Sequence, residues 1–313
     1  MDNRLLLIWC FLVVQACQSH GPKPGAQPLH PVESVSHDSQ ISGHREDYLH
    51  VGHEVRVRKY FSFIDSVVAA VDTALHYKIT EHVLVQANPW ILDSLKATDY
   101  YARKSKGIFQ EDQADEIIFH RGDSLRIPDS LAVARIQAKL ASTVFDLNIP
   151  EFRIRLLQEG ATILSCRARV GKNAIQYLKL AGREVNLRTP VGKGKIVRIA
   201  RVPYQLNPET GKLYEGTHRD DGGYTKMPVI PWLEPEINGV RYGDMIHPTT
   251  NPVTLGKAFS HGCVGTSESD AWTIYYNCPV GTRVCFRYDL KIVNEKGDTV
   301  RLKDIYAQPP KHL

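Results

Sequence analysis

The sequence predicts an α+β protein, with a mostly helical domain over residues 55–150 and a mainly β domain over residues 151–290. In the β domain, apolar and charged side chains alternate with the period of half-exposed strands. Such short and frequent strands favour a sandwich or a barrel. In the helical domain, apolar side chains instead recur at helical spacing, at Tyr60, Phe63, Ile64, Val67, Val68, Val71 and Leu75.

Further elements are expected in the helical domain. A second helix over 79–87 should end at Asn88, because a proline such as Pro89 disfavours helical geometry in the residue before it. The remaining predicted elements are helices over 93–106 and 130–145, a strand over 117–119 and a turn at 121–123. Residues 80–91 resemble the second half of a LysM peptidoglycan-binding module, and the alternative is a scaffold that packs on the β domain.

Two short motifs at the predicted turn have no supporting context. Residues 122–125 spell a lipase motif and residues 121–123 an adhesion tripeptide, but Gly and Asp are also ordinary turn residues. The β domain that follows has predicted strands at 152–156, 162–170, 175–180, 195–201 and 282–288.

A cysteine and a histidine in the β domain have the pattern of a nucleophile and its base. Cys263 ends the small-residue turn Ser260-His261-Gly262-Cys263, and His247 lies sixteen positions upstream. A nucleophilic thiol needs a base, and backbone N–H groups must hold the oxyanion. The motif Ser267-x-x-Asp270 predicts a helix start, and a nearby helix N-terminus would favour the thiolate.

Two other interpretations of Cys263 do not involve catalysis: a buried thiol that packs as a small apolar side chain, and a metal ligand. The metal interpretation is weak, because the sequence contains no Cys-x-x-Cys and no second ligand pair at zinc-like spacing. No metal and no organic cofactor is implied.

The longer pattern resembles the L,D-transpeptidase (YkuD-type) catalytic domain family over residues 151–290. The stretch has an Ile-His pair, a glycine in the spacer and then Ser-His-Gly-Cys. Upstream motifs follow in the family's order. The matching positions are 169–172, 189–192, 227–228, 238–239, 246–247, 256 and 260–263.

The resemblance implies a mixed, mainly antiparallel β-sandwich that acts on peptidoglycan stem peptides. Cys263 would be the nucleophile, His247 its base, and a thioester on Cys263 would be passed to an acceptor amine to form 3→3 cross-links. Ser260, His261 and Gly262 would form the oxyanion site and shape the turn, and Met227, Arg219 and Gly265 would contact substrate. Carbapenems, which acylate the thiol of this family, are expected to be covalent inhibitors.

Two positions depart from the family pattern. Pro248 follows the histidine where many members have Gly or Ser, so a backbone carbonyl would have to orient His247. Gly265 stands where many members have Arg or Asn, and Arg219, Asp220 or Asp221 could compensate.

Other functions remain open. An L,D-carboxypeptidase would use the same thiol with water as acceptor, and an inactive peptidoglycan-binding lipoprotein is a third possibility. A papain-like peptidase ranks low, because that family has its Cys before its His.

The N-terminus has the pattern of an export signal. Residues 1–17 combine a basic residue, a short apolar run and a lipobox-like ending at Cys17, which predicts a lipid anchor and a periplasmic location. The alternative is a plain cleaved signal peptide. Residues 18–54, rich in Pro, Gly, Ser and His, predict a tether rather than a metal-binding tract, and residues 291–313 form a C-terminal extension.

Composition limits the partners. The net charge of +5 is small for 313 residues and argues against dedicated nucleic-acid binding. Cys278 and Cys285 could pair across a turn, but free thiols are favoured, and Cys263 must be reduced to react.

Overall fold

The structure is a computed structural model that describes residues 47–294 and 296–313. The predicted signal peptide, Cys17 and most of the tether lie outside these residues and stay predictions. The described residues belong to one compact unit. The predicted tether is wrong for its last residues, because β1 (Asp47–His50) pairs with β4 (Ser124–Ile127) and Val51 is 2% exposed.

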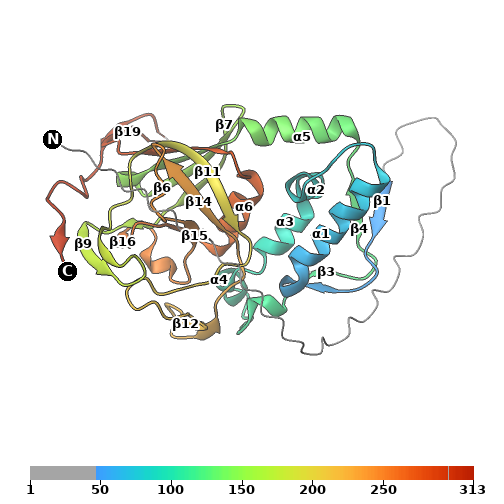
Figure 1. The fold of residues 1–313 in the computed structure, drawn as a ribbon, viewed down its shortest axis with the longest axis horizontal. Coiled ribbons are helices and arrows are strands. Elements are labelled where there is room, and N and C mark those ends of the chain that lie inside the picture. The colour runs from blue at the N-terminus through green and yellow to red at the C-terminus, as the bar shows by residue number, and fades with distance from the viewer. Residues whose placement is uncertain (1–46, 295) are drawn as a thin grey trace, which may run out of the picture. The chain divides into compact units, whose positions relative to one another are not determined.

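The predicted helical part is confirmed as a group of helices with one long member. Helix α1 (Val57–Ala74) buries the apolar side that its spacing predicted, including Tyr60 and Ile64. The other helices are α2 (Glu81–Ala87), α3 (Pro89–Lys96), α4 (Tyr100–Lys104) and α5 (Ser130–Ser142). Figure 1 shows α1 and α3 close to strand β3 (Ile117–Phe119), which was also predicted.

Two helix predictions need correction. The predicted helix over 93–106 is divided, because the Asp99 side chain caps a new helix by accepting the N–H groups of Tyr101 and Ala102. The helix predicted over 130–145 ends at Ser142. Residues Val144–Asn148 form strand β5 instead, because they pair with strands on both sides and begin with Val144 and Phe145, which suit a strand.

A mixed eight-stranded sheet organises the rest of the chain (Figure 1). Its order is β17-β15-β14-β11-β18-β5-β6-β7, and only the pairs β15–β17 and β18–β5 are parallel. The strands other than β5 are β6 (Arg153–Gln158), β7 (Ala161–Arg167), β11 (Gly192–Ala200), β14 (Trp232–Ile237), β15 (Ile246–Pro248), β17 (Val264–Thr266) and β18 (Arg283–Arg287). The predicted mainly antiparallel β architecture is therefore confirmed.

The two edges of this sheet meet. Cys166 on β7 and Thr266 on β17 come within 3.6 Å through sulfur and hydroxyl oxygen. Just beyond β7, Arg169 and Gly265 exchange two main-chain hydrogen bonds of 2.8 and 2.9 Å. We call this Arg169–Gly265 junction the seam. Joining the edges leaves fewer unpaired main-chain groups, and it brings the residues after β7 next to β17.

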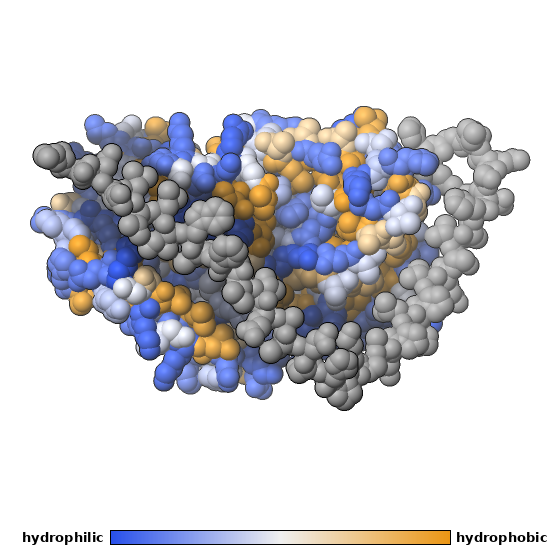
Figure 2. Space-filling view, in the orientation of Figure 1, coloured by the Kyte–Doolittle hydropathy of each residue, from blue (hydrophilic) through white to orange (hydrophobic). Residues whose placement is uncertain are grey.

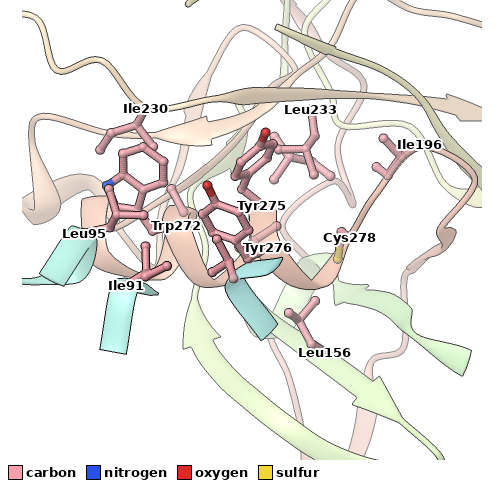
Figure 3. Packing of buried hydrophobic residues seen from close by; sticks show 14 of the residues in the cluster. Ile91, Leu95, Leu156, Ile196, Ile230, Leu233, Trp272, Tyr275, Tyr276 and Cys278 are labelled. Atoms are coloured by element: carbon pink, nitrogen blue, oxygen red, sulfur yellow. The ribbon is translucent and has the colours of Figure 1, made fainter. Parts of the chain in front are cut away.

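Helix α6 (Glu268–Asn277) lies at the centre of the core. It follows β17 directly and begins at the predicted cap, since Ser267 accepts the N–H of Asp270. Trp272 and Tyr276 are fully buried, and Figure 3 shows them among aliphatic side chains of α3 and of the sheet. The Tyr60 and Tyr276 hydroxyls share a 2.5 Å hydrogen bond. Helices from the first half of the chain therefore pack around the helix that follows the predicted nucleophile.

Smaller sheets complete the fold. Strand β8 (Val170–Gly171) pairs with β16 (Ala258–Ser260), and the predicted C-terminal extension returns to place β21 (Lys311–His312) beside β9 (Ala174–Leu178). The other short strands are β2 (Val55–Arg56), β10 (Arg183–Asn186), β12 (Gly216–His218), β13 (Tyr224–Lys226), β19 (Lys291–Val293) and β20 (Thr299–Arg301).

Apolar side chains form several separate groups between polar ones on the face drawn in Figure 2. Among the described residues, no helix has the length and apolar character needed to cross a membrane.

Candidate active site

Cys263 lies in a tight turn between β16 and β17. Gly262 adopts a φ of +119°, a backbone conformation that favours glycine. The Ser260 hydroxyl donates to the Cys263 carbonyl at 2.6 Å and accepts the Gly262 N–H at 3.3 Å. Ser260 and Gly262 thus shape the turn that presents the thiol.

His247 is brought to the strand next to the thiol. It lies on β15, whose parallel register with β17 places His247 opposite Gly265. The N–H of Met245, just before β15, donates to the Cys263 sulfur at 3.3 Å. Two residues sixteen positions apart in the sequence therefore lie on adjacent segments of one sheet.

The His247 ring is held in a defined orientation. Its Nδ1–H donates to the Pro248 carbonyl at 2.7 Å, which leaves Nε2 with a free lone pair. The Trp232 ring stacks on the imidazole with centroids 4.5 Å apart. The backbone carbonyl expected from the sequence does orient the histidine, although proline replaces the residue found in many family members.

The environment favours an uncharged thiol and an uncharged imidazole. Burial, with a contribution from the Asp244 carboxylate, raises the pKa of Cys263 to about 12. Burial, together with the Arg169 charge, lowers the pKa of His247 to about 3. Desolvation by burial is the largest influence on the thiol, and strand β17 lies between Cys263 and the N-terminus of α6 that was expected to favour a thiolate.

Two charged side chains that the sequence reasoning did not select flank Cys263. A Cβ atom on Gly262 would lie 2.2 Å from Oδ1 of Asp244, and one on Gly265 would lie 2.9 Å from Nε of Arg169. Burial raises the pKa of Asp244 to about 7. In the sequence, only Gly265 pointed to these charged neighbours of Cys263, because its missing side chain leaves room for the Arg169 guanidinium.

Comparison with known families identifies the domain that holds this site. Residues 142–285 match the YkuD family, described as the L,D-transpeptidase catalytic domain. This part of the chain is similar to L,D-transpeptidase catalytic domains. The match begins before the predicted boundary at residue 151 and thereby includes β5.

Solved L,D-transpeptidases are among the structures that are similar to part of this chain. One from Xylanimonas cellulosilytica is 17% identical with a TM-score of 0.33, and the match covers 65% of this chain and 92% of that one. L,D-transpeptidase 3 from Mycobacterium tuberculosis, solved with a faropenem-derived adduct, is 15% identical (TM-score 0.28; 47% and 60% covered). A mutant L,D-transpeptidase from Enterococcus faecium is 14% identical (TM-score 0.31; 46% and 49% covered). The comparison with curated proteins gives no match.

The Arg219 side chain is held by contacts inside the protein. Its guanidinium donates to Glu268 at 2.5 Å and to the Thr225 hydroxyl at 2.8 Å, and it lies 4.5 Å from the centre of the Tyr100 ring. These contacts engage the Arg219 guanidinium with other side chains of the protein. The suggestion that Arg219 compensates for Gly265 is therefore corrected, because Arg169 occupies that space.

The two aspartates proposed as alternatives for Arg219 are also used elsewhere. Asp220 accepts the N–H of Val253 at 2.7 Å, and Asp221 forms an ion pair with Lys104.

The other predicted site residues lie around the loop that follows β11. Met227 lines a cavity of about 290 Å³ whose wall includes Tyr204 and Leu213. Neither Cys263 nor His247 is part of that wall, so substrate contact by Met227 stays a prediction. The His261 ring pairs with Glu209 at 2.8 Å.

The four cysteines in the described part of the chain are free thiols. Cys166 and Cys278 are buried, whereas Cys263 and Cys285 are partly exposed. No group of three or more metal-binding side chains occurs in the described part of the chain.

The C-terminal extension supports the catalytic turn through a short chain of hydrogen bonds. The Tyr306 hydroxyl donates to the Gly171 carbonyl at 2.6 Å and accepts the Thr189 N–H at 3.2 Å. The Thr189 hydroxyl accepts the Gly171 N–H and donates to the Gly262 carbonyl, both at 2.8 Å. Tyr306 thus reaches the residue before the nucleophile, although it lies beyond the family match.

Replacing Tyr306 by phenylalanine is expected to slow acylation of Cys263 about 3- to 10-fold. The variant keeps the ring, which stacks on Tyr288, but loses two hydrogen bonds, each worth about 1 kcal/mol. Acylation by a carbapenem, followed by mass spectrometry, measures the effect. Tyr177→Phe, at an exposed tyrosine of β9, is the control. A wild-type rate in Tyr306→Phe would show that the extension does not support the turn.

Proposed function

We propose that this protein is an L,D-transpeptidase that cross-links peptidoglycan stem peptides through a thioester on Cys263. The observation that supports this most directly is the position of the thiol. Cys263 sits in a glycine-shaped turn beside the strand of an oriented histidine, inside a domain of this family. The predicted signal peptide and Cys17 would place the reaction outside the cytoplasm, next to its polymer.

The first half of the proposed reaction transfers an acyl group to sulfur. His247 Nε2 takes the Cys263 proton as the sulfur attacks the carbonyl between the third stem residue, a diamino acid, and the terminal D-Ala. Main-chain N–H groups around His261 to Cys263 stabilise the oxyanion. The C–N bond then breaks, and His247 returns its proton to the leaving amine of D-Ala. The neutral resting pair fits this order, because His247 begins unprotonated.

The second half forms the cross-link. The side-chain amine of an acceptor stem attacks the thioester, and His247 accepts a proton from that amine. The C–S bond breaks, and the proton returns to the Cys263 thiolate. The product is an amide between two third residues, a 3→3 cross-link. Water as acceptor would instead give a tripeptide, which is the L,D-carboxypeptidase alternative.

Incubation of the purified protein with tetrapeptide muropeptides, read by mass spectrometry, tests the proposal. We expect a cross-linked dimer that lacks one D-Ala. Cys263→Ala should give none, and Cys285→Ser, at the other partly exposed thiol, should behave as wild type. A carbapenem is expected to acylate wild type and Cys285→Ser but not Cys263→Ala.

The remaining outcomes select among the alternatives. Tripeptide without dimer would replace the transpeptidase assignment with an L,D-carboxypeptidase. Absence of both products, with Cys263 reduced and unmodified, would contradict an enzyme and favour a binding role.

A further inference from the structure

We propose that Arg169 binds the terminal carboxylate of the donor stem peptide. This inference rests on the proposed function and adds the group that would recognise the leaving D-Ala. Three observations support it: the place of Arg169 at the seam, the absence of an anion beside its guanidinium, and the opposite charge on the other side of Cys263.

The seam places the guanidinium close to the nucleophile. Arg169 exchanges main-chain hydrogen bonds with Gly265, two residues after Cys263. A Cβ atom on Gly265 would come within 2.9 Å of Nε and 3.2 Å of Nη2 of Arg169. The missing side chain at Gly265 therefore makes space for a guanidinium that arrives from another segment of the chain.

The Arg169 charge has no partner in the described part of the chain. Nη1 donates to the Thr249 hydroxyl at 2.9 Å, but Nε is shielded from solvent without an acceptor. Within residues 47–294 and 296–313, no carboxylate lies at ion-pair distance from Arg169, whereas the buried Arg219 pairs with Glu268. A largely desolvated cation without an anion is unfavourable, so the site is suited to an anionic ligand.

The length of the donor stem peptide beyond its scissile bond suits the spacing between Cys263 and Gly265, against which Arg169 lies. The terminal carboxylate carbon of that peptide lies three bonds beyond the scissile carbonyl carbon, a span of about 4 Å. Along β17, two residues span about 7 Å. An acyl carbon bonded to the Cys263 sulfur could therefore leave the next carboxylate near Gly265. Arginine commonly binds carboxylates through two parallel hydrogen bonds.

Asp244 gives the site a direction. It lies against Gly262, which precedes Cys263 in the turn, whereas Arg169 lies against Gly265, which follows it, and none of the described residues donates a hydrogen bond to the Asp244 carboxylate. Above its pKa of about 7, where it is ionised, Asp244 would repel a second carboxylate. In that pH range the opposite charges of Arg169 and Asp244 favour binding with the terminal D-Ala toward Gly265 and the remainder of the stem toward Gly262.

A pair of donor substrates tests the inference without any change to the protein. One is a tetrapeptide stem that ends in D-Ala, and the other is the same stem ending in D-alaninamide. Release of D-Ala or D-alaninamide by the full chain is measured as kcat/KM. Wild type is expected to prefer the acid about 10- to 150-fold, the usual worth of hydrogen bonds to a charged group. Equal rates for acid and amide would overturn the proposal.

Variants then assign the preference to one side chain. Arg169→Met should lose most of the preference by slowing only the acid, and Arg169→Lys should keep part of it. Arg167→Met, two residues earlier on β7, is the matched control, because its guanidinium donates to the Leu255 carbonyl instead. An equal loss for acid and amide in Arg169→Met would overturn the proposal and assign Arg169 to the oxyanion or the turn.

Failure of the proposed function gives a different result. In that case wild type would turn over neither acid nor amide, and Arg169 would have no donor to bind. If Arg169→Met does not fold, the acid-to-amide ratio of wild type and of Arg169→Lys still decides the question.

Discussion

Replacing His247 by glutamine is expected to slow acylation of Cys263 by about 100- to 10,000-fold, the usual contribution of a general base. Burial holds the pKa of Cys263 at about 12, so almost no thiolate is present at neutral pH. The reaction therefore depends on removal of the proton during attack. His247, with a pKa of about 3 and a free Nε2, is unprotonated and available for that step.

The pH dependence separates this mechanism from a pre-formed ion pair. Neither group titrates between about pH 5 and pH 9, so wild-type acylation should not fall with decreasing pH in that range. Protonation of Asp244 near its pKa of about 7 removes a charge that raises the pKa of Cys263, so it should raise the rate rather than lower it. In His247→Gln only the thiolate can react, so the rate should rise about tenfold per pH unit. A wild-type rate that falls below about pH 6.5 would show that His247 keeps an ordinary pKa.

The second histidine of the motif provides the control for this prediction. His261→Gln removes a ring that pairs with Glu209 and leaves the main chain of the turn in place. We expect its acylation rate to fall less than about tenfold. A larger loss in His261→Gln than in His247→Gln would exchange the roles of the two residues.

Local signals in the sequence were sufficient to select Cys263 and His247, which the fold places on adjacent segments of one sheet. The turn at 260–263 depends on glycine and serine close together in the chain, and the α6 start depends on Ser267 and Asp270. The histidine orientation could also be inferred, since only main-chain groups were left to replace the side chain missing at Pro248.

Features that depend on distant pairing could not be predicted. Residues 144 and 145 were included in the predicted helix, but residues 144–148 form a strand because β18, about 140 residues later, pairs with them. Arg169 reaches the site only because the edges of the sheet meet at the seam. The Cys263 pKa depends on how far the fold desolvates the thiol, which a nearby predicted helix start does not indicate.

The packing around α6 explains why the helical part and the catalytic sheet form one unit. The Asp99 carboxylate accepts the N–H of Ser269 at 3.0 Å, and Glu268 accepts the N–H of Tyr100 at 3.1 Å. The first turn of α6 is thus held by residues from the helical part. The segment resembling half of a LysM module contributes α2 and α3, and α3 packs Ile91 and Leu95 into the same core (Figure 3). That packing favours the scaffold alternative.

Replacing Arg219 by methionine is expected to lower the free energy of unfolding by about 3 to 5 kcal/mol, the usual cost of leaving one charge of a buried pair unpaired. The Arg219 and Glu268 side chains are only 2% and 3% exposed. Burial raises the pKa of Glu268 and Arg219 opposes that rise, so the variant should protonate Glu268 more readily. The loss of stability should therefore be largest at neutral pH and shrink as the pH falls.

Urea unfolding of two further variants shows whether the buried charge is the cause. Adding Glu268→Gln to Arg219→Met removes the unpaired carboxylate and should restore part of the stability, because a neutral amide costs less to bury than an anion. Arg58→Met, at a half-exposed ion pair with Asp115, should cost less than about 1 kcal/mol. If Arg219→Met lost no more than Arg58→Met, the pair would not stabilise the fold. Because Glu268 begins α6 directly after the strand that follows Cys263, a loss confirmed in Arg219→Met should also slow acylation of the thiol.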